Sequence, residues 1–355
     1  MHTPLDKPAV DVVGGVDTHK DLHIAAVVTT GGVVLGTEAF PTTRAGYRAM
    51  LYWMRSHGTL LRVGVEQTGS FGAGLCRHLA LAGVPVLEVT GPEPAERRSK
   101  GKDDRLDAVA AARAALSGRR VQVAKDRSGA VEALRVLRTT RSTAVKCRRA
   151  ALQQLRNTVL AAPDEVREPL RHLSRMQLIR TCAGSRPDMR AWRDAAVATR
   201  IALKALASRI LGLNDEIAAL DAMIKPLVVE LGPGLVDLEG VGTENAGAFI
   251  VAAGDNPDRL KSEASFAMMC GACPIPASSG KTQRHRLNRG GNRQLNSALH
   301  MVVVCRIRTD DRTKAYVARR TREGLSKREI LRCLKRYVAR EIYNTLIGRP
   351  PSATA

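Results

Sequence analysis

The feature that most constrains the fold is an alternation of short apolar segments with amphipathic segments before residue 90. Short apolar runs bounded by turn residues predict strands, and runs with apolar residues on one helical face predict helices. The predicted strands are 12–17, 22–30, 33–40, 61–66 and 84–89, and the predicted helices are 42–57 and 69–82. Gly31-Gly32 is a hairpin signal between the second and third strands. This order predicts a mixed sheet with helices packed on it.

Carboxylates stand at the ends of two of these strands and at the start of a later helix. Asp17 ends the first strand and Glu66 ends the fourth. Asp104 and Asp107 lie in the sequence KDDRLDA, which opens an Ala-rich helical run, and their spacing of three places them on one helix face. Strand ends in an open sheet are where α/β sites form, so the four carboxylates are expected to converge.

Converging carboxylates repel one another unless a cation lies between them. Hard divalent cations take carboxylate oxygens, and two such ions a few ångströms apart suit phosphodiester cleavage. The sequence therefore predicts a site for Mg²⁺, with Mn²⁺ as the alternative ion. The residues leave a second interpretation open for the helix start, in which a capping Asp and a negative first turn complement the helix dipole.

The charge of the chain indicates a polyanionic partner. The net charge is +22, the isoelectric point is near 10.4, and Arg outnumbers Lys, which fits bidentate binding of phosphate. No apolar run reaches the ~18 residues that a membrane helix needs, and no signal peptide is recognisable. With seven scattered cysteines, we expect a cytoplasmic protein with reduced thiols and no membrane partner. Cys270 and Cys273 form a single CxxC without a second pair, so we expect no zinc site there.

Residues 124–226 have the composition of long helices. Apolar residues with alternating 3,4 spacing predict a coiled-coil seam: Leu203, Leu206, Ile210, Leu213, Ile217, Leu220 and Ile224. A second apolar stripe over 131–159 is interrupted by Arg138, Arg141 and Arg148, which are either solvated edges or nucleic-acid contacts. The sequence leaves open whether the two stripes pair within one chain or between chains.

A second candidate centre lies in the C-terminal part, 227–355. Gly240 and Gly242 predict either a phosphate-binding hairpin or an ordinary turn between helices. Ser279-Gly280 follows a Pro-containing loop and precedes several basic residues. A serine hydroxyl becomes a nucleophile when its proton is removed or its developing charge is stabilised, which nearby cations and a metal-bound phosphate can do. The alternative is a Ser-Gly turn in a basic DNA-binding loop.

Three of these segments resemble the DEDD transposases of bacterial insertion sequences: Gly15-Val16-Asp17-Thr18-His19-Lys20, Val65-Glu66-Gln67-Thr68-Gly69 and Lys102-x-Asp104-x-x-Asp107-Ala108. Those enzymes are similar to RuvC-type Holliday-junction resolvases, and the family includes pilin-gene invertases and recombinases guided by a bridge RNA. The pattern Gly271-x-x-Pro274-x4-Ser279-Gly280, followed by Gly291-Asn292 and Leu295, resembles the C-terminal serine domain of the same family.

The resemblance implies a fold and a mechanism. It implies a ribonuclease H-like, RuvC-like catalytic domain at 1–123, a helical coiled-coil region at 124–226 and a mainly α serine transposase domain at 227–355. Asp17, Glu66, Asp104 and Asp107 would be catalytic metal ligands, and Ser279 would attack DNA to form a covalent phosphoserine. Asp103 occupies a variable position, and the neighbouring Ser278 leaves the choice of serine open.

The implied partners are double-stranded DNA of the element ends and target, a structured guide RNA, and further copies of the chain in a dimer or tetramer. The candidate nucleic-acid contacts are Lys20, Lys102, Arg105, Gly280, Lys281, Arg284, Arg286, Arg289, Asn292 and Arg293. Two alternatives remain. One is a metal-dependent RuvC-like Holliday-junction endonuclease that uses water, and the other is a catalytically inert nucleic-acid-binding scaffold.

Overall fold

The computed structural model describes residues 10–89, 103–127, 129–278 and 285–348. The chain divides into two compact units. The sheet unit comprises residues 1–129 and 253–261, and the helical unit comprises residues 130–252 and 262–355. The domain boundaries expected at residues 123 and 226 stay predictions.

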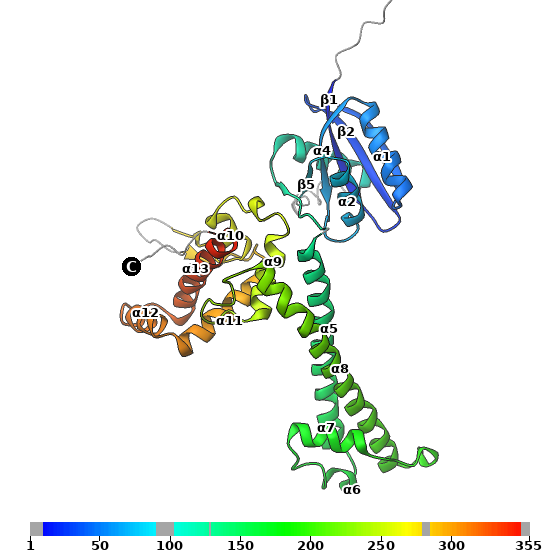
Figure 1. The fold of residues 1–355 in the computed structure, drawn as a ribbon, viewed down its shortest axis with the longest axis vertical. Helices are drawn as coiled ribbons and strands as arrows, with labels where there is room; N and C mark the ends of the chain where they lie inside the picture. The colour runs from blue at the N-terminus through cyan, green and yellow to red at the C-terminus, as the bar shows by residue number, and fades with distance from the viewer. Residues whose placement is uncertain (1–9, 90–102, 128, 279–284, 349–355) are drawn as a thin grey trace, which may run out of the picture. The chain divides into compact units, whose positions relative to one another are not determined.

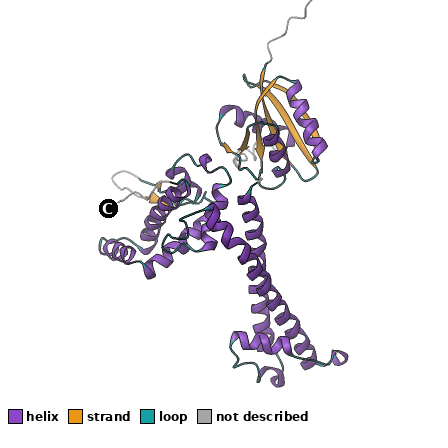
Figure 2. Cartoon of the chain, in the orientation of Figure 1, coloured by secondary structure: helices purple, strands orange, loops and turns teal. Residues whose placement is uncertain are grey.

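The sheet unit contains a six-stranded mixed sheet in the order β3-β2-β1-β4-β5-β6 (Figures 1 and 2). Its strands are β1 (Asp11–Thr18), β2 (Leu22–Thr29), β3 (Val34–Pro41), β4 (Thr59–Glu66), β5 (Val86–Val89) and β6 (Val121–Val123). β1, β4 and β5 are parallel, whereas β2, β3 and β6 run antiparallel to their neighbours. The predicted mixed α/β architecture and its first five strands are confirmed. β6 was not predicted, because three residues are too few to show a strand pattern.

Helices cover both faces of this sheet: α1 (Arg44–Ser56), α2 (Ala73–Leu81) and α4 (Asp104–Ser117). Side chains alternate along a strand, so β1 divides its apolar residues between the two faces. Val12 and Val16 join the core formed with α1 and α2, whereas Val13 packs with Ala112 and Ala115 of α4. The face toward α4 is the one that carries the candidate site.

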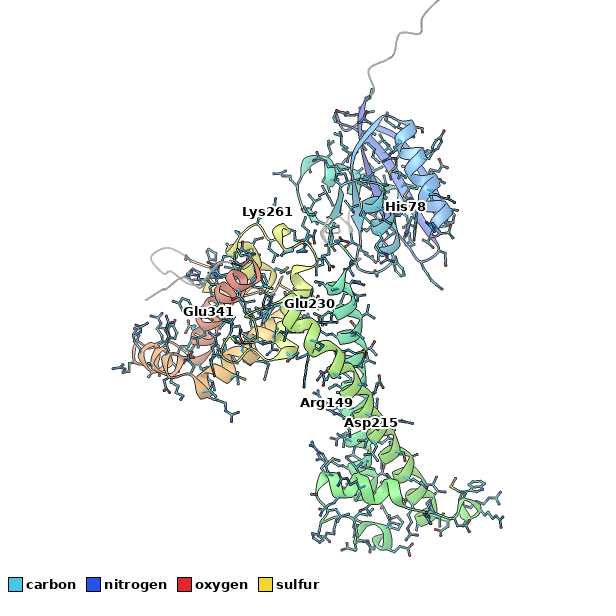
Figure 3. All side chains as sticks on the ribbon, viewed as in Figure 1. His78, Arg149, Asp215, Glu230, Lys261 and Glu341 are labelled. Carbon is cyan, nitrogen blue, oxygen red and sulfur yellow. The ribbon has the colours of Figure 1, made fainter. Side chains whose placement is uncertain are left out.

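The helical unit begins with a pair of long antiparallel helices, α5 (Ala130–Leu160) and α8 (Ala195–Leu231), which pack against each other (Figure 1). Six of the seven predicted seam residues are buried: Leu203, Leu206, Ile210, Ile217, Leu220 and Ile224. The stripes therefore pair within one chain, and charged residues such as Arg149 and Asp215 are exposed on the pair (Figure 3). Whether the packing is that of a coiled coil stays a prediction.

The arginines that interrupt the α5 stripe join this helix to its neighbours. Arg141 Nη2 donates to Asp221 Oδ2 at 3.1 Å, and Arg148 Nη1 donates to Asn214 Oδ1 at 3.0 Å, both on α8. Arg138 Nη2 donates to Glu244 Oε1 at 2.6 Å. Acceptors on adjacent helices bind all three arginines, and whether they also contact nucleic acid stays a prediction.

Helix α8 continues through Pro226 to Leu231. Proline lacks the N–H that would bond to the carbonyl four residues earlier, which usually ends or kinks a helix. Here Ile224 and Val228 on either side of Pro226 are buried, so packing holds the helix together across that position. Two short helices, α6 (Asp164–Arg167) and α7 (Arg175–Gly184), connect α5 to α8 and share a buried core with them.

The rest of the helical unit is mainly α. Its elements are α9 (Thr243–Ala253), α10 (Glu263–Met269), the two-residue strands β7 (Ile275–Pro276) and β8 (His285–Arg286), α11 (Arg293–Thr309), α12 (Asp311–Arg322) and α13 (Lys327–Leu346). Helix α13 begins with a capping box in which Ser326 and Glu329 exchange hydrogen bonds. None of the helices in the described ranges is both long enough and apolar enough to cross a membrane.

Candidate metal centre and nucleic-acid interface

Asp17 and Glu66 lie at corresponding positions near the carboxyl ends of two neighbouring strands, β1 and β4. β1 and β4 are parallel, with Val16 opposite Val65, so Asp17 and Glu66 each follow a paired residue. Both are buried, at 6% exposure. Strand alternation places Asp17 on the side of Val13 and Gly15, which is the face covered by α4. By the same alternation, Glu66 lies on the side of Gly64, which also faces α4.

Two glycines let α4 approach these strand ends. Gly15 and Gly64 are opposite each other in the sheet. A Cβ at Gly15 would overlap the α4 backbone and lie 2.6 Å from Ala112 Cα, and one at Gly64 would lie 2.5 Å from the Ala111 carbonyl oxygen. Helix and sheet therefore touch backbone to backbone, which no larger residue at either glycine allows.

The same contact directs the acidic first turn of α4 toward the strand ends. Asp104 and Asp107 precede the sheet-facing Ala108 and Ala111 by four residues, so they share a helix face with them. Asp103 has a different role. Its side chain caps the helix by accepting from the Arg105 backbone N–H at 2.8 Å.

Asp17, His19 and Asp104 form a compact cluster. His19 Nε2 lies 3.0 Å from Asp17 Oδ2 and 3.3 Å from Asp104 Oδ2. One ligand atom from each of the three residues lies within 4.8 Å of the others. Two carboxylate oxygens and one imidazole nitrogen at these separations can bind one divalent cation.

The electrostatics of Asp17 fit a cation at this position. Burial raises the pKa of Asp17, the nearby charges of Asp107 and Asp104 raise it further, and His19 opposes them by lowering it. A cation between the carboxylates would favour the charged form and relieve this repulsion. Mg²⁺ and Mn²⁺ prefer the carboxylate oxygens, and an imidazole nitrogen is more acceptable to Mn²⁺ than to Mg²⁺.

Glu66 and Asp107 lie outside this three-residue cluster, although the sequence predicts all four carboxylates as ligands. The charge of Asp107 nevertheless adds to the effect of burial in raising the pKa of Asp17. The end of β4 is held by hydroxyl groups. Thr18 Oγ1 donates to the Glu66 carbonyl at 3.1 Å, and Thr68 Oγ1 donates to Glu88 Oε1 at 2.8 Å.

His19 is the residue that sequence reasoning missed. It belongs to the segment that carries the resemblance, but its role depends on the approach of α4, which lies far away in the chain. Its backbone is held by a buried histidine, because the His19 N–H donates to His23 Nδ1 at 3.3 Å. A histidine two residues after a strand-end aspartate was the available signal.

The candidate nucleic-acid residues lie in both units. Lys20 and Arg105 are exposed near the metal cluster in the sequence, at the end of β1 and the start of α4. Arg286, Arg289 and Arg293 are exposed in the helical unit. The structure does not describe the predicted serine centre. The predicted residues outside the described ranges are Lys102, Ser279, Gly280, Lys281 and Arg284.

Asn292 of the predicted C-terminal centre has a structural role. Asn292 caps α11, with Oδ1 accepting from Gln294 N at 2.9 Å and Leu295 N at 3.2 Å. Cys270 is buried, which raises the pKa of its thiol to about 12 and disfavours the thiolate that binds metals.

The mixed sheet with acidic strand ends, followed by a helical region, is consistent with the RuvC-like DEDD transposase fold. A transposase family model of the IS110 DEDD type matches residues 14–162. A second model, for transposases of the IS116/IS110/IS902 family, matches residues 234–318. Two segments of the chain are thus similar to transposase domains of the IS110 family.

A curated relative is similar to part of the chain. It is an uncharacterized 43.6 kDa protein of the insertion element IS110 from Streptomyces coelicolor. The two are 30% identical over 139 residues, which make up 38% of this chain and 34% of the relative. The match thus spans about a third of the length of that relative.

Proposed function

We propose that this protein is a DNA transposase that cuts and joins the ends of an insertion sequence at a metal-bound carboxylate site. The observation that carries the proposal is the cluster of Asp17, His19 and Asp104, formed by the carboxyl end of β1 and the first turn of α4. The match to two IS110-family transposase domains supports it.

Each residue of the site has a role in the proposal. Asp17 and Asp104, with Glu66 and Asp107 beside them, would hold Mg²⁺ or Mn²⁺, which stabilises charge on a scissile phosphate when bound. His19 lies between two of these carboxylates and offers a further ligand nitrogen. Lys20 and Arg105 are exposed and available to contact the DNA backbone.

The nucleophile in this proposal is Ser279. Its oxygen forms a phosphoester bond to the DNA phosphorus as the bond to a deoxyribose oxygen breaks, which leaves a covalent phosphoserine and a free hydroxyl. The ester keeps the bond energy, so a hydroxyl of another strand can displace the serine and rejoin the DNA. This assignment is supported by the resemblance of the segment around Pro274 and Ser279 to the serine domain of the family.

The test is a denaturing gel of the protein incubated with DNA of the element ends, Mg²⁺ and flanking transcripts. A covalent protein–DNA band is expected for the wild-type protein and for the controls Asp103→Asn and Ser278→Ala. Asp103→Asn is matched to Asp104→Asn, because it removes one charge from the adjacent residue while asparagine still caps the helix. No band is expected for Asp104→Asn or Ser279→Ala.

Other outcomes identify the alternatives. Nicked DNA without a covalent band, formed equally by Ser279→Ala but lost in Asp104→Asn, identifies a junction endonuclease that uses water. If Asp104→Asn matches the wild type in every DNA assay, the protein is an inert nucleic-acid-binding scaffold.

The proposed partners are duplex DNA, a structured guide RNA and further copies of the chain. The net charge of +22 supports a nucleic-acid partner, and the α5–α8 pair, proposed here as a coiled coil, would contribute to a dimer or tetramer. Neutralising each phosphate releases counterions, so DNA affinity should fall steeply between ~50 and ~200 mM salt. A flat salt dependence would argue against a backbone-dominated interface.

A further inference from the structure

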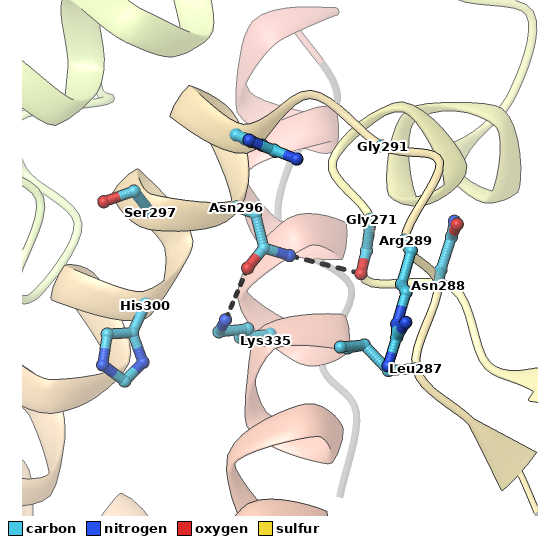
Figure 4. A pocket seen from close by; sticks show the side chains of 10 residues that line it. Gly271, Leu287, Asn288, Arg289, Gly291, Asn296, Ser297, His300 and Lys335 are labelled. Carbon is cyan, nitrogen blue, oxygen red and sulfur yellow. Dashed lines mark hydrogen bonds between the residues drawn. The ribbon is translucent and has the colours of Figure 1, made fainter.

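The helical unit contains a polar cavity that none of the proposed catalytic residues lines. It has a volume of about 470 Å³ and is formed by the segment after β8 together with α11 and α13 (Figure 4). Four basic residues line it: Arg289, Arg293, His300 and Lys335. Among the described residues that line it, none is acidic and none is Phe, Tyr or Trp.

Lys335 is held in place at one wall of this cavity. Its Nζ donates to Asn296 Oδ1 at 2.8 Å, and Asn296 Nδ2 in turn donates to the carbonyls of Cys270 at 2.9 Å and Gly271 at 3.2 Å (Figure 4). These two carbonyls accept only, so they fix the Asn296 amide with its oxygen toward the ammonium group. Within the described chain, Asn296 is the one hydrogen-bond partner of Lys335, which leaves further N–H donors for a ligand.

Close packing of Gly271 and Gly291 positions the backbone carbonyls that bind Asn296. A Cβ at Gly291 would lie 3.0 Å from the Cys270 carbonyl carbon and overlap Gly271. Gly271 has a φ of +64°, a conformation that favours glycine. The close contact of the two segments holds the carbonyls that orient Asn296, so the position of Lys335 depends on backbone packing.

Among the described residues, no carboxylate forms an ion pair with the basic residues that line the cavity. Arg289 and Arg293 have no ion-pair partner among the described residues. Arg293 lies in the first turn of α11, which contains no acidic residue, although cations are unfavourable at a helix N-terminus. Burial lowers the pKa of Lys335. The two arginines without an ion pair, one of them at a helix start, favour binding of an anion, and such an anion would stabilise the charged form of Lys335 against the effect of burial.

We infer that this cavity binds a phosphodiester group of duplex DNA, with Lys335 as the direct contact and Asn296 fixing the position of its ammonium group. The inference rests on the proposed function for the choice of DNA. The described lining offers three cationic side chains, Arg289, Arg293 and Lys335, and a single ring, His300, which favours contact with the phosphate backbone over the stacking of unpaired bases.

The test compares Lys335→Met with Lys327→Met, which removes the same charge from an exposed lysine at the start of the same helix. Affinity for a fluorescent DNA duplex is measured by anisotropy over a series of salt concentrations, with EDTA present so that cleavage does not contribute. Lys335→Met should weaken binding roughly ten- to a hundredfold, as expected for a hydrogen bond to a charged group. It should also reduce the slope of log affinity against log salt by about 0.9, the value for one phosphate contact.

Equal affinities and equal slopes for the two variants would overturn the inference. A second measurement uses the wild-type protein, so it does not depend on the folding of a variant. Acetylation of lysines is followed by mass spectrometry with and without the duplex, and DNA should protect Lys335 more than Lys327. Equal acetylation of Lys335 in both samples counts against it.

These results are independent of the proposed reaction. If no covalent adduct forms but Lys335→Met still weakens DNA binding, phosphate binding in the cavity is supported and the proposed transposase mechanism is contradicted. Conversely, if the adduct forms and Lys335→Met binds DNA as tightly as the wild type, the mechanism is supported and DNA binding by the cavity is contradicted.

Discussion

Replacing Gly15 by alanine should damage the metal site without touching any metal ligand. An added Cβ at Gly15 would lie 2.6 Å from Ala112 Cα and would overlap the backbone of α4. Carbon atoms in contact are separated by about 3.5 Å or more, so α4 must recede by about 1 Å. Asp104 starts this helix and moves with it, whereas Asp17 and His19 stay at the end of β1.

The expected cost has two parts. Overpacking of this kind destabilises a protein by about 1–3 kcal/mol. Metal sites tolerate changes of only about 0.2 Å in ligand distance, so a shift of about 1 Å should weaken Mn²⁺ or Mg²⁺ binding tenfold or more. Both effects follow from one methyl group.

The assay uses the two tryptophans of the chain, because Trp53 lies in the sheet unit and Trp192 lies in the helical unit. Trp192 is 57% exposed, so a Trp192→Phe background leaves Trp53 as the fluorescent reporter of the sheet unit. Urea unfolding gives the free energy of unfolding, and the rise in Tm with Mn²⁺ concentration gives the metal affinity. Gly31→Ala is the matched control, since its Cβ would meet Thr29 Oγ1 at 3.6 Å, an ordinary contact.

The reasoning is refuted if Gly15→Ala unfolds at the same urea concentration as Gly31→Ala and keeps the metal-dependent rise in Tm. A loss of stability with unchanged metal affinity would refute only the link between α4 docking and the cluster.

Three further predictions concern stability. Burial lowers the pKa of His23 to about 4. Between pH 6.5 and 4 the unfolded chain therefore binds a proton at His23 that the folded chain does not bind. The free energy of unfolding should fall by up to about 3 kcal/mol over this range. Urea unfolding at several pH values should show this loss in the wild type and in the exposed control His172→Gln, and His23→Gln should lose less. Gly212→Ala in α8 should raise stability by about 0.5–1 kcal/mol, measured as a higher Tm, because nothing lies within 4 Å of the new Cβ; an unchanged or lower Tm would contradict it. A double-mutant cycle of Arg141→Met and Asp221→Asn should give a coupling of about 0.5–1 kcal/mol for this partly exposed pair, and additive effects would show that the pair contributes nothing.

Local patterns in the sequence were sufficient to predict the elements that depend on local interactions. The first five strands and the helix that starts at Asp104 follow from apolar periodicity and from capping residues within a few positions of the helix start. Residues such as Asp17 and Glu66 were identifiable because a carboxylate at the end of an apolar strand is unusual in sequence. Strand alternation then places both on one face of the sheet.

Contacts between distant segments were decided by the tertiary structure alone. His19 meets Asp104 because Gly15 and Gly64 let α4 lie directly on the sheet, and no local pattern encodes that approach. Arg141 looks like an interruption in an apolar stripe until α8 supplies Asp221. Local periodicity records which face of an element is apolar, whereas packing decides which faces meet.

The cavity around Lys335 also combines features that the sequence predicts with contacts that only the tertiary structure creates. The sequence indicated a basic segment after Ser279, but not that Asn296 of α11 forms a hydrogen bond with Lys335 of α13. That hydrogen bond connects residues 39 apart and depends on a turn at Gly271. The sequence by itself determined the elements, their charges and the residue types suited to metal and phosphate. The tertiary structure decided which of those residues meet, because side chains from distant segments come together only when the chain packs.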